Sequence, residues 1–315
     1  MKIGIVYDLK DDYDINLVKS NDFTVLEEVI LLSNILSQLG HEIKLINGIY
    51  FLIDNIKIIK ESYDLLINMV EGYDSRNRES LVPALLELYK IPFIGSDCYA
   101  NTICLDKYLA KLIAQSCGVQ TPKYAVYIKN TQTIINDIPK TKQIVLKPTC
   151  GGSSDGLLLM VNDNNDIMSI LKNKSIEFNQ NILIEEYIQG TDISISLYGN
   201  SLNGYEIIGG VEILDKNNKE LILYDQTYKE NYDVKKISPR WNNSTKEKTY
   251  KMCIEMSNAI DLRGFFRFDF RLSNDCIYFL EINSIPSLCN DGSFIQSIKV
   301  NNKDIKTIFK GVIGV

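Results

Sequence analysis

Four short apolar runs alternate with amphipathic stretches in the first part of the chain. The runs are KIGIVY (2–7), EIKLIN (42–47), DLLINMV (64–70) and PFIGS (92–96). Between them, apolar residues recur at helical spacing from about Asn21 to Leu39, where Gly40 ends the pattern, and again through PALLELY. This rhythm is typical of a parallel sheet covered by helices. It predicts a Rossmann-like α/β domain over residues 1–98.

The middle of the chain, residues 99–190, has shorter elements. Apolar residues at helical spacing predict one helix over 99–118, with Gly118 as its stop. A second helix is predicted from about Asn165 to Lys172. Around it lie the strand-like runs KYAVYI, QIVLKP, LLLMV and ILIEEYI. We predict a compact α+β lid.

Strand patterns dominate residues 191–315. They are DISISLYG, GYEIIGGVEI, GFFRFDFRL and CIYFLEIN, with a polar stretch from Tyr224 to Asn243 and a helix from Thr245 to Ala259 among them. These patterns predict a C-terminal antiparallel-sheet domain, and the whole chain is predicted to be an α/β protein with an α+β lid.

Composition narrows the class of protein. The 315 residues are 45% hydrophobic and carry a net charge of -6, without a Lys/Arg-rich run, which argues for small-molecule substrates and against a nucleic-acid partner. Seven cysteines are scattered singly beside one histidine, His41, so zinc ligands are few and reduced thiols are expected. Asp8 ends the first apolar run too early for a signal peptide, and no run of eighteen apolar residues occurs. We expect a cytoplasmic protein without a membrane segment.

The last two strands carry the clearest chemistry. Ser273, Asn274 and Asp275 are turn formers, so the strands on either side should form an antiparallel hairpin. Period-two alternation, with the chain folded back at Asn274, then brings Asp269 close to Glu281 and Arg267 close to Asn283. Phe266, Phe268 and Phe270 face the opposite, buried side. Oxygen ligands of this kind suit Mg²⁺, and Arg267 could stabilise an oxyanion. A solvated sheet face is the alternative.

Two further segments suggest a nucleotide site. In KPTCGGSSDG, Lys147 and a loop of glycines and serines could wrap phosphate oxygens, although a plain surface loop fits as well. In ILIEEYIQGTD, the backbone at Tyr187 could meet a purine, with Glu185, Glu186 or Asp192 for the exocyclic amine or the ribose hydroxyls. Charge at a strand end is the alternative here.

Eight stretches, taken in order between Asp64 and Phe294, carry a family resemblance. They are ELYKIPFIGSD, CLDKYLAK, GVQTPKY, VLKPTCGGSSDG, ILIEEYIQGTDISISLYG, YDQTYK, RGFFRFDF and FLEINSIPS. Each is a soft match alone, but their order argues against chance. Together they resemble the ATP-grasp superfamily, and most closely its D-alanine:D-alanine ligase branch.

The resemblance implies a three-domain fold in which ATP lies between two antiparallel sheets under a mobile loop. Several residues are similar to the family's nucleotide-binding residues. They are Lys107, Lys147 and Lys229 at the phosphates, Gly152, Ser153 and Ser154 at the loop tip, Glu185 and Glu186 beside adenine, Tyr187 and Ile188 in the hinge, and Asp192 at the ribose. Arg267 matches the arginine that stabilises the tetrahedral intermediate, and Asp269, Glu281 and Asn283 match the ligands of Mg²⁺ or Mn²⁺.

The implied activity is amide-bond formation between a small carboxylate, such as an amino acid, and an amine. The γ-phosphoryl group of ATP passes to the carboxylate, the amine attacks the acyl phosphate, and ADP and phosphate are released. Lys229, Arg267, Ser153 and Ser154 are the expected catalytic residues. The family also implies a homodimer.

The departures from the family concern the substrate. The family's histidine-glycine motif and serine-rich stretch are replaced by MVEGYDSRNRES and YDLKDDYDINLVK, and Gly151, Ser287 and Glu230 replace other family residues. Glu71, Arg76, Arg78 and Glu79 form a charged cluster in which an arginine could grip a carboxylate. An exposed, salt-bridged helix start is the alternative. Ser287 is a further candidate substrate residue.

Three other functions compete with a general ligase. One is a D-alanine:D-alanine ligase of cell-wall synthesis with a rewritten first-substrate site. The second is a non-catalytic nucleotide-binding relative, which the intact set of lysines, Arg267 and metal ligands speaks against. The third is a carboxylase-type ATP-grasp enzyme, which usually has a longer chain.

Overall fold

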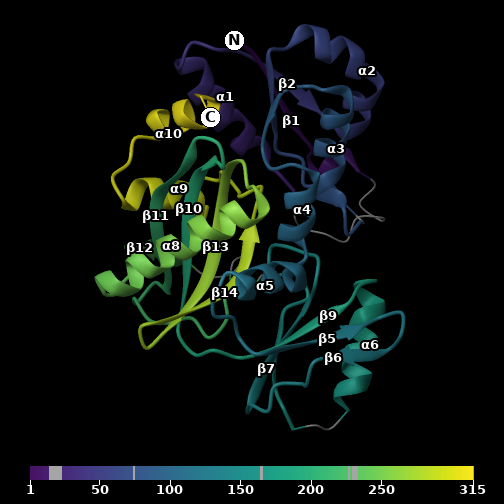
Figure 1. The fold of residues 1–315 in the computed structure, drawn as a ribbon, viewed down its shortest axis with the longest axis vertical. Coiled ribbons are helices and arrows are strands. Elements are labelled where there is room, and N and C mark those ends of the chain that lie inside the picture. The colour runs from purple at the N-terminus through teal and green to yellow at the C-terminus, as the bar shows by residue number, and fades with distance from the viewer. Residues whose placement is uncertain (14–22, 74, 164–165, 226–227, 229–232, 315) are drawn as a thin grey trace.

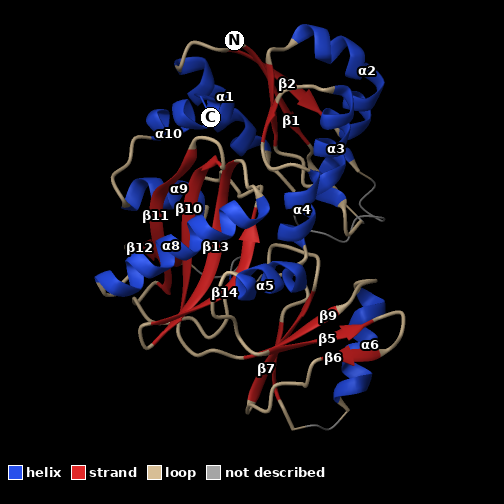
Figure 2. Ribbon diagram, viewed as in Figure 1, coloured by secondary structure: helices blue, strands red, loops and turns tan. Residues whose placement is uncertain are grey.

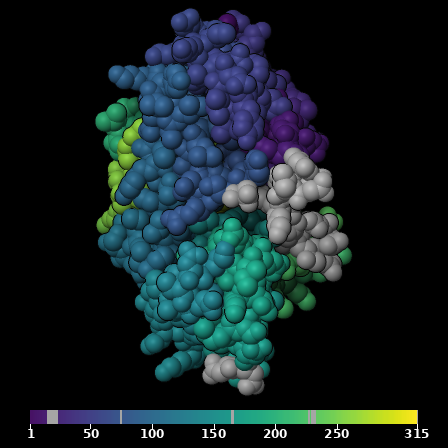
Figure 3. Space-filling view, turned by 90° about the vertical axis from the view of Figure 1, so that its right-hand side faces the viewer, coloured from purple at the N-terminus to yellow at the C-terminus, as the bar shows by residue number. Residues whose placement is uncertain are grey.

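The computed structural model contains three β-sheets with helices packed around them (Figure 1). It describes residues 1–13, 23–73, 75–163, 166–225, 228 and 233–314. The N-terminal part and the middle sheet lie at opposite ends of the long axis, as the space-filling view in Figure 3 shows. No helix among the described residues is long and apolar enough to cross a membrane.

The N-terminal sheet is parallel, in the order β2-β1-β3-β4. Its strands are β1 (Lys2–Tyr7), β2 (Glu42–Asn47), β3 (Leu65–Asn68) and β4 (Phe93–Ile94). The helical elements of this part are η1 (Lys10–Asp12), α1 (Leu26–Gln38), α2 (Ile49–Ser62), η2 (Arg78–Ser80) and α3 (Leu81–Tyr89). Ile3 and Ile5 pack with α1, whereas Val6 packs on the other face with α2 and α3. Helices on both faces confirm the predicted parallel α/β sheet.

The lid sheet is antiparallel, in the order β6-β5-β9-β7-β8. Its strands are β5 (Tyr124–Ile128), β6 (Thr133–Ile135), β7 (Gln143–Pro148), β8 (Leu158–Val161) and β9 (Ile182–Glu186). One face packs on α6 (Ile167–Glu177) through Ile144, Leu146, Ile182 and Ile184. The alternate residues of β7 and β9 therefore face away from this core, toward the C-terminal part of the chain.

The C-terminal sheet is antiparallel, in the order β12-β11-β10-β13-β14. Its strands are β10 (Thr191–Asn200), β11 (Gly204–Asp215), β12 (Val234–Ile237), β13 (Gly264–Ser273) and β14 (Cys276–Asn283). The helix α8 (Asn243–Ile260) crosses one face (Figure 2). Phe266, Phe268 and Phe270 are fully buried on this face. The opposite face of β13 therefore carries Arg267, Asp269 and Arg271.

Several predicted elements need correction. The single helix predicted over 99–118 is two helices, α4 (Cys98–Leu105) and α5 (Lys107–Ser116). Asp106 breaks it because this residue is extended and its side chain caps α5, accepting from the amides of Tyr108 and Leu109. The helix predicted from Asn21 begins at Leu26, and the one predicted to end at Lys172 continues to Glu177.

Several elements of the described part of the chain were not predicted, among them α2 and the short helices η1 and η2. The others lie further along the chain. They are β6, β12 and the helices α9 (Ser293–Val300) and α10 (Ile305–Gly314). α10 contacts α1, and its Phe309 is fully buried in a core shared with the N-terminal sheet. The C-terminal helix α10 therefore packs against the N-terminal part of the chain (Figure 1). The division at residues 98 and 190 stays a prediction.

Candidate active site

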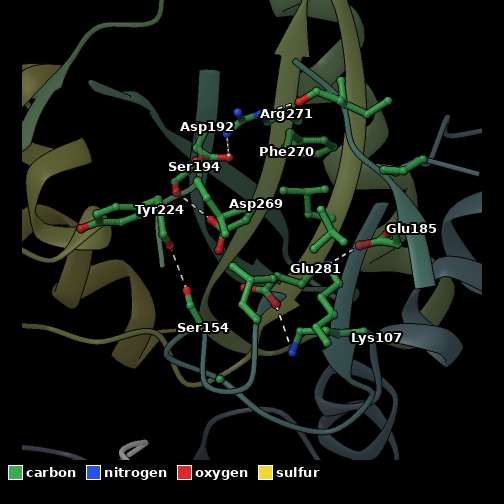
Figure 4. Close-up of a pocket in the computed structure, with 18 of the residues that line it drawn as sticks. Lys107, Ser154, Glu185, Asp192, Ser194, Tyr224, Asp269, Phe270, Arg271 and Glu281 are labelled. Carbon is green, nitrogen blue, oxygen red and sulfur yellow. Dashed lines mark hydrogen bonds and ion pairs between the residues drawn. The ribbon is translucent and has the colours of Figure 1, made fainter. Parts of the chain in front are cut away.

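A pocket lies between the lid sheet and the C-terminal sheet (Figure 4). From the lid side it is lined by Lys147, the loop after β7 and the chain that leaves β9. From the opposite side it is lined by the polar face of β10, β13 and β14. The pocket therefore brings together segments that lie more than a hundred residues apart in the sequence.

A buried carboxylate with two lysines forms the lid side of the pocket. Glu185 of β9 is 3% exposed, and its two oxygens form ion pairs with Lys111 of α5 and Lys147 of β7. Burial raises the pKa of Glu185, but the two lysines outweigh this effect and hold it below its usual value. Burial lowers the pKa of Lys111 to about 8, although the Glu185 charge acts in the opposite direction.

Lys107 stands at the first turn of α5 and reaches across the pocket. Its ammonium group lies 3.2 Å from a carboxylate oxygen of Glu281 and also donates to the carbonyl of Gly151. Burial raises the pKa of Glu281, but Lys107, Lys147 and Arg267 more than compensate and lower it to about 2. Lys107 thus connects the loop after β7 to the hairpin of the C-terminal sheet.

The loop after β7 covers one side of the pocket. Gly152 and Ser154 line the pocket, and Ser153 and Ser154 have left-handed backbone angles (φ of 50° and 64°). The Ser154 hydroxyl donates to the carbonyl of Tyr224 at 3.0 Å, as Figure 4 shows. Gly156 ends the loop at φ 72°, where an added Cβ would lie 2.6 Å from Phe178. The loop therefore contacts both sides of the pocket.

The hairpin β13–β14 brings together the residues that were predicted to lie close to each other. Asp269 lies opposite Glu281 and Arg267 opposite Asn283, with a bulge between Asp269 and Phe270. Arg267 donates to both oxygens of Asp269, at 2.9 and 2.8 Å. Asp269 also accepts from Ser194 and from Asn283. The predicted proximity is confirmed.

The donor set at this hairpin fits Mg²⁺. Among the described residues, no group of three or more His, Cys, Asp or Glu is arranged to hold a metal alone. Mg²⁺ does not need such a cage, because it takes one or two carboxylates together with waters and nucleotide phosphates. Asp269 and Glu281 are carboxylates on paired residues of the hairpin, and the side chain of Asn283 adds an amide oxygen. The NH₂ group of the same Asn283 side chain donates to Asp269.

The chain that links the two sheets forms the far end of the pocket. Glu186, Tyr187, Ile188 and Asp192 all line it. Glu186 accepts from the amide of Lys123, and the Tyr187 hydroxyl donates to the carbonyl of Ile222. Arg271 forms a 2.9 Å ion pair with Asp192 and donates to the carbonyl of Ile188. This end of the pocket is held together by side chains of both sheets.

The charged cluster of the N-terminal part contains salt bridges, as the alternative interpretation held, but its members Arg78 and Glu79 are buried. Arg78 is 5% exposed and pairs with Glu71 at 3.2 Å and Glu79 at 3.3 Å. Glu79 accepts from Ser284, the residue that follows Asn283. Arg76 is exposed and lines a second cleft, beyond the loop after β7. The cluster therefore adjoins the β13–β14 hairpin end of the pocket.

Ser287 contacts the N-terminal helix. Its hydroxyl donates to Glu28 of α1 at 2.8 Å, and the amide of Leu288 donates to the other oxygen at 2.9 Å. Glu28 is buried, so these bonds fix the chain after β14 against α1. Lys229, another predicted site residue, lies outside the described residues.

Three residues of the pocket region were missed by the sequence reasoning. Lys111 follows Lys107 by one helical turn, a spacing that places both on one side of α5. Arg271 continues the alternation of Arg267 and Asp269 along β13, which was a usable signal. Ser194 faces Asp269 from the neighbouring strand, a contact that only the sheet order shows.

Comparison with known proteins identifies the family. A family model described as D-ala D-ala ligase C-terminus matches residues 113–313. A D-alanine–D-alanine ligase of Aquifex aeolicus is 26% identical over 239 residues, which cover 75% of this chain and 77% of the relative. One of Wigglesworthia glossinidia brevipalpis is 27% identical over 274 residues, which cover 84% and 74%.

Solved structures show the same fold. The D-alanine–D-alanine ligase of Bacillus anthracis in complex with ATP aligns with a TM-score of 0.72 at 19% identity, covering 100% of this chain and 96% of that one. The VanG D-Ala:D-Ser ligase of Enterococcus faecalis aligns with a TM-score of 0.74 at 16% identity, covering 99% and 98%. The family model and the relatives, together with this fold, identify an ATP-grasp protein. The chain belongs to the D-alanine–D-alanine ligase family, and its general activity is that of an ATP-dependent, ADP-forming carboxylate–amine ligase.

Proposed function

We propose that the protein joins an amino acid, or a similar small carboxylate, to an amine through an acyl-phosphate intermediate. The observation that carries this proposal is the placement of Arg267, Asp269 and Glu281 across one pocket from Lys107 and Lys147. The same pocket therefore contains cationic side chains that can bind phosphate groups and carboxylate oxygens that can bind a metal ion. Phosphoryl transfer depends mainly on such positioning and charge balance.

The residues of the pocket have distinct proposed roles. In the present structure, Lys107 pairs with Glu281, and Lys147 pairs with Glu185. When ATP binds, both lysines turn to its phosphates, because a phosphate group carries more negative charge than a carboxylate. Ser153 and Ser154 close the loop over the reacting groups and exclude water. By the family resemblance, Lys229 also contacts the phosphates. Arg267 stabilises the oxyanion that forms when the amine attacks. The base and the sugar of the nucleotide are proposed to bind at the far end of the pocket, which is formed by Glu185, Glu186, Tyr187, Ile188 and Asp192.

Asp269, Glu281 and Asn283 are the proposed metal ligands. When bound, Mg²⁺ neutralises charge on the transferring phosphoryl group, and Mn²⁺ offers the same oxygen chemistry. In the present structure Arg267 and Lys107 are the counter-ions of the two carboxylates. Arg267 and Lys107 are therefore expected to change partners when the nucleotide and metal bind.

The substrate carboxylate is proposed to bind where the N-terminal part meets the hairpin. Arg78 is already paired with Glu71 and Glu79, so its contribution is to hold this junction. Arg76 is exposed and is the better candidate to grip a carboxylate group bidentately. The clamp between Ser287 and Glu28 shapes the same junction.

D-alanine is one candidate substrate, since the matched relatives are D-alanine–D-alanine ligases. The rewritten stretches 7–19 and 69–80 favour a different amino acid or a short peptide. A test is ATP-dependent phosphate release with Mg²⁺ against pooled D-amino acids, L-amino acids and short peptides. Release that needs one pool and disappears in Glu281→Gln, but not in the exposed control Glu255→Gln, supports the proposal. Pool-independent release, or release that survives Glu281→Gln, contradicts it.

The remaining proposals concern the setting of the reaction. A homodimer follows from the family resemblance, and light scattering of the purified chain tests it. The cytoplasm is the proposed location, supported by seven cysteines that are all unpaired. The acidic balance of the sequence supports small molecules as partners, in preference to nucleic acid or membrane.

A further inference from the structure

Arg271 connects three segments at the far end of the pocket. It lies on β13, is 5% exposed and lines the pocket. Its Nε donates to the carbonyl of Ile188 at 3.0 Å, and one terminal nitrogen donates to the carbonyls of Leu221 and Ile222 at 2.8 and 3.0 Å. The other terminal nitrogen pairs with Asp192 at 2.9 Å. One guanidinium thus ties the linking chain, β10 and the 221–222 segment to the C-terminal sheet.

The planar fork of an arginine suits this arrangement. A guanidinium has five donors in fixed directions, whereas a lysine has one compact ammonium group that cannot reach three segments at once. The Arg271 plane also lies against the Tyr187 ring, 5.7 Å from its centroid. The Tyr187 hydroxyl donates to the carbonyl of Ile222, the same oxygen that Arg271 contacts. Arg271 and Tyr187 therefore hold one wall of the pocket in a single arrangement.

The ion pair also sets the chemistry that Asp192 presents. Asp192 lines the pocket with 18% of its side chain exposed, and its Oδ1 is the oxygen that Arg271 holds. Within the described part of the chain, its Oδ2 has no hydrogen-bond partner. An ionised carboxylate accepts hydrogen bonds only, so this oxygen suits a ligand that brings hydroxyl donors. The negative charge of Asp192 is balanced by Arg271, and this limits the repulsion between Asp192 and nearby phosphate groups.

We propose that Arg271 is a positioning residue that orients Asp192 toward the sugar hydroxyls of the nucleotide and thereby selects ribonucleotides over deoxyribonucleotides. The inference rests on the proposed placement of ATP in this pocket. Arg271 acts through Asp192 and through the wall formed by the 221–222 segment. It is distinct from the residues at the phosphates, so it affects nucleotide binding and selectivity more than the chemical step.

Equilibrium binding separates this role from catalysis. Calorimetry with ATP, 2′-deoxy-ATP and 3′-deoxy-ATP gives the preference for each sugar hydroxyl without needing the second substrate. We expect Arg271→Met to weaken ATP binding by roughly 10- to 100-fold, the usual range for lost hydrogen bonds to charged groups, and to remove most of the preference for ATP over one of the deoxy-nucleotides. Arg271→Lys should behave nearly as Arg271→Met.

Two further variants keep the test decisive. Asp192→Asn leaves the hydrogen bonds from Arg271 to the backbone in place, and it should reduce the preference for ATP over the deoxy-nucleotide. The double variant Arg271→Met/Asp192→Asn should reduce this preference no further than either single variant. Arg240→Met is the matched control, because Arg240 also pairs with a carboxylate of the C-terminal sheet, Glu212, but does not line the pocket. It should leave the sugar preference unchanged.

The outcomes distinguish this inference from the proposed function. A sugar preference that persists in both Arg271→Met and Asp192→Asn overturns the role of Arg271, even if the melting temperature falls. Equal binding of all three nucleotides by the unaltered protein overturns it as well. The ligase proposal fails on a different result, namely ATP that binds with a sugar preference but is not cleaved with any amino-acid or peptide pool.

Discussion

The ammonium group of Lys107 lies 3.2 Å from a carboxylate oxygen of Glu281, although one residue begins α5 and the other stands on β14. The pair is largely shielded from water, since Lys107 and Glu281 expose 10% and 28% of their side chains. An ion pair on the open surface contributes little to the free energy of folding. In an enclosed pair, by contrast, removing one partner is costly, because the other charge is left without a counter-ion. In the proposed reaction, Lys107 exchanges this carboxylate for a phosphate group.

Replacement of Lys107 tests that exchange. We expect Lys107→Met to raise the dissociation constant of ATP about 10- to 100-fold, because a charged donor to the phosphates is lost. Lys107→Arg keeps the charge and should lose much less. Titration calorimetry measures both constants. An unchanged affinity in Lys107→Met contradicts a role of Lys107 at the phosphates.

Arg267 should matter for the chemical step more than for nucleotide binding. Lysine cannot reproduce its bidentate contact with Asp269, so we expect Arg267→Lys to lower kcat roughly 10²- to 10³-fold, the usual cost of removing an oxyanion donor. The dissociation constant of ATP should change little. Arg263→Lys is the matched control, because Arg263 is 44% exposed and pairs with Asp97 and Asp261 outside the pocket. Equal kcat values for the two variants would refute the assignment.

The fully buried Lys111 should be required for stability. Lys111→Met leaves Glu185 with Lys147 as its remaining partner, and removing one member of a buried ion pair typically costs about 3–5 kcal/mol in the free energy of unfolding. We expect a loss near the lower end of this range, measured by urea unfolding. Lys251→Met, at an exposed lysine, should change stability by less than about 0.5 kcal/mol. Adding Glu185→Gln to Lys111→Met should restore part of the loss, and no restoration would argue against the charge explanation.

Glu212 should contribute to the acid sensitivity of the fold. Burial raises its pKa, but hydrogen bonds from the side chain and amide of Arg240 outweigh this and hold it below the usual value of 4.5. A carboxyl group whose pKa is lowered by folding stabilises the protein above its unfolded pKa and loses this contribution as the pH falls below it. Below about pH 4.5, the free energy of unfolding should therefore decrease less steeply with falling pH in Glu212→Gln than in the unaltered protein. Urea unfolding between pH 7 and pH 3 measures it, and a slope equal to that of the unaltered protein contradicts it.

Local patterns in the sequence predicted much of the site. Strand alternation and the turn formers at 273–275 predicted that Asp269 lies close to Glu281 and Arg267 close to Asn283. The exact register was not predicted, because it depends on the pairing of Ser273 with Cys276 and on the bulge after Asp269. The parallel sheet of the N-terminal part followed from its apolar runs. Such features depend on residues that are close in the chain.

Contacts between distant segments could not be predicted in the same way. Apart from Asp192, the hydrogen-bond acceptors around Arg271 are mainly backbone carbonyl groups that any sequence provides, so nothing in residues 188, 221 or 222 marks them. The break at Asp106 was hidden because apolar residues keep helical spacing on both sides of it, although an aspartate before Lys107 is a typical helix cap. Burial of Phe309 depends on how α10 packs on the N-terminal part.

The most direct test of the proposed ligase mechanism follows one oxygen atom. A substrate amino acid labelled with ¹⁸O in its carboxylate, taken from the pool that supports phosphate release, is incubated with the protein, ATP and Mg²⁺. Attack of the carboxylate on the γ-phosphoryl group predicts one ¹⁸O atom in each inorganic phosphate released, and no labelled phosphate with Glu281→Gln. Phosphate that carries no label would show that ATP is hydrolysed without activating the carboxylate, and would contradict the mechanism.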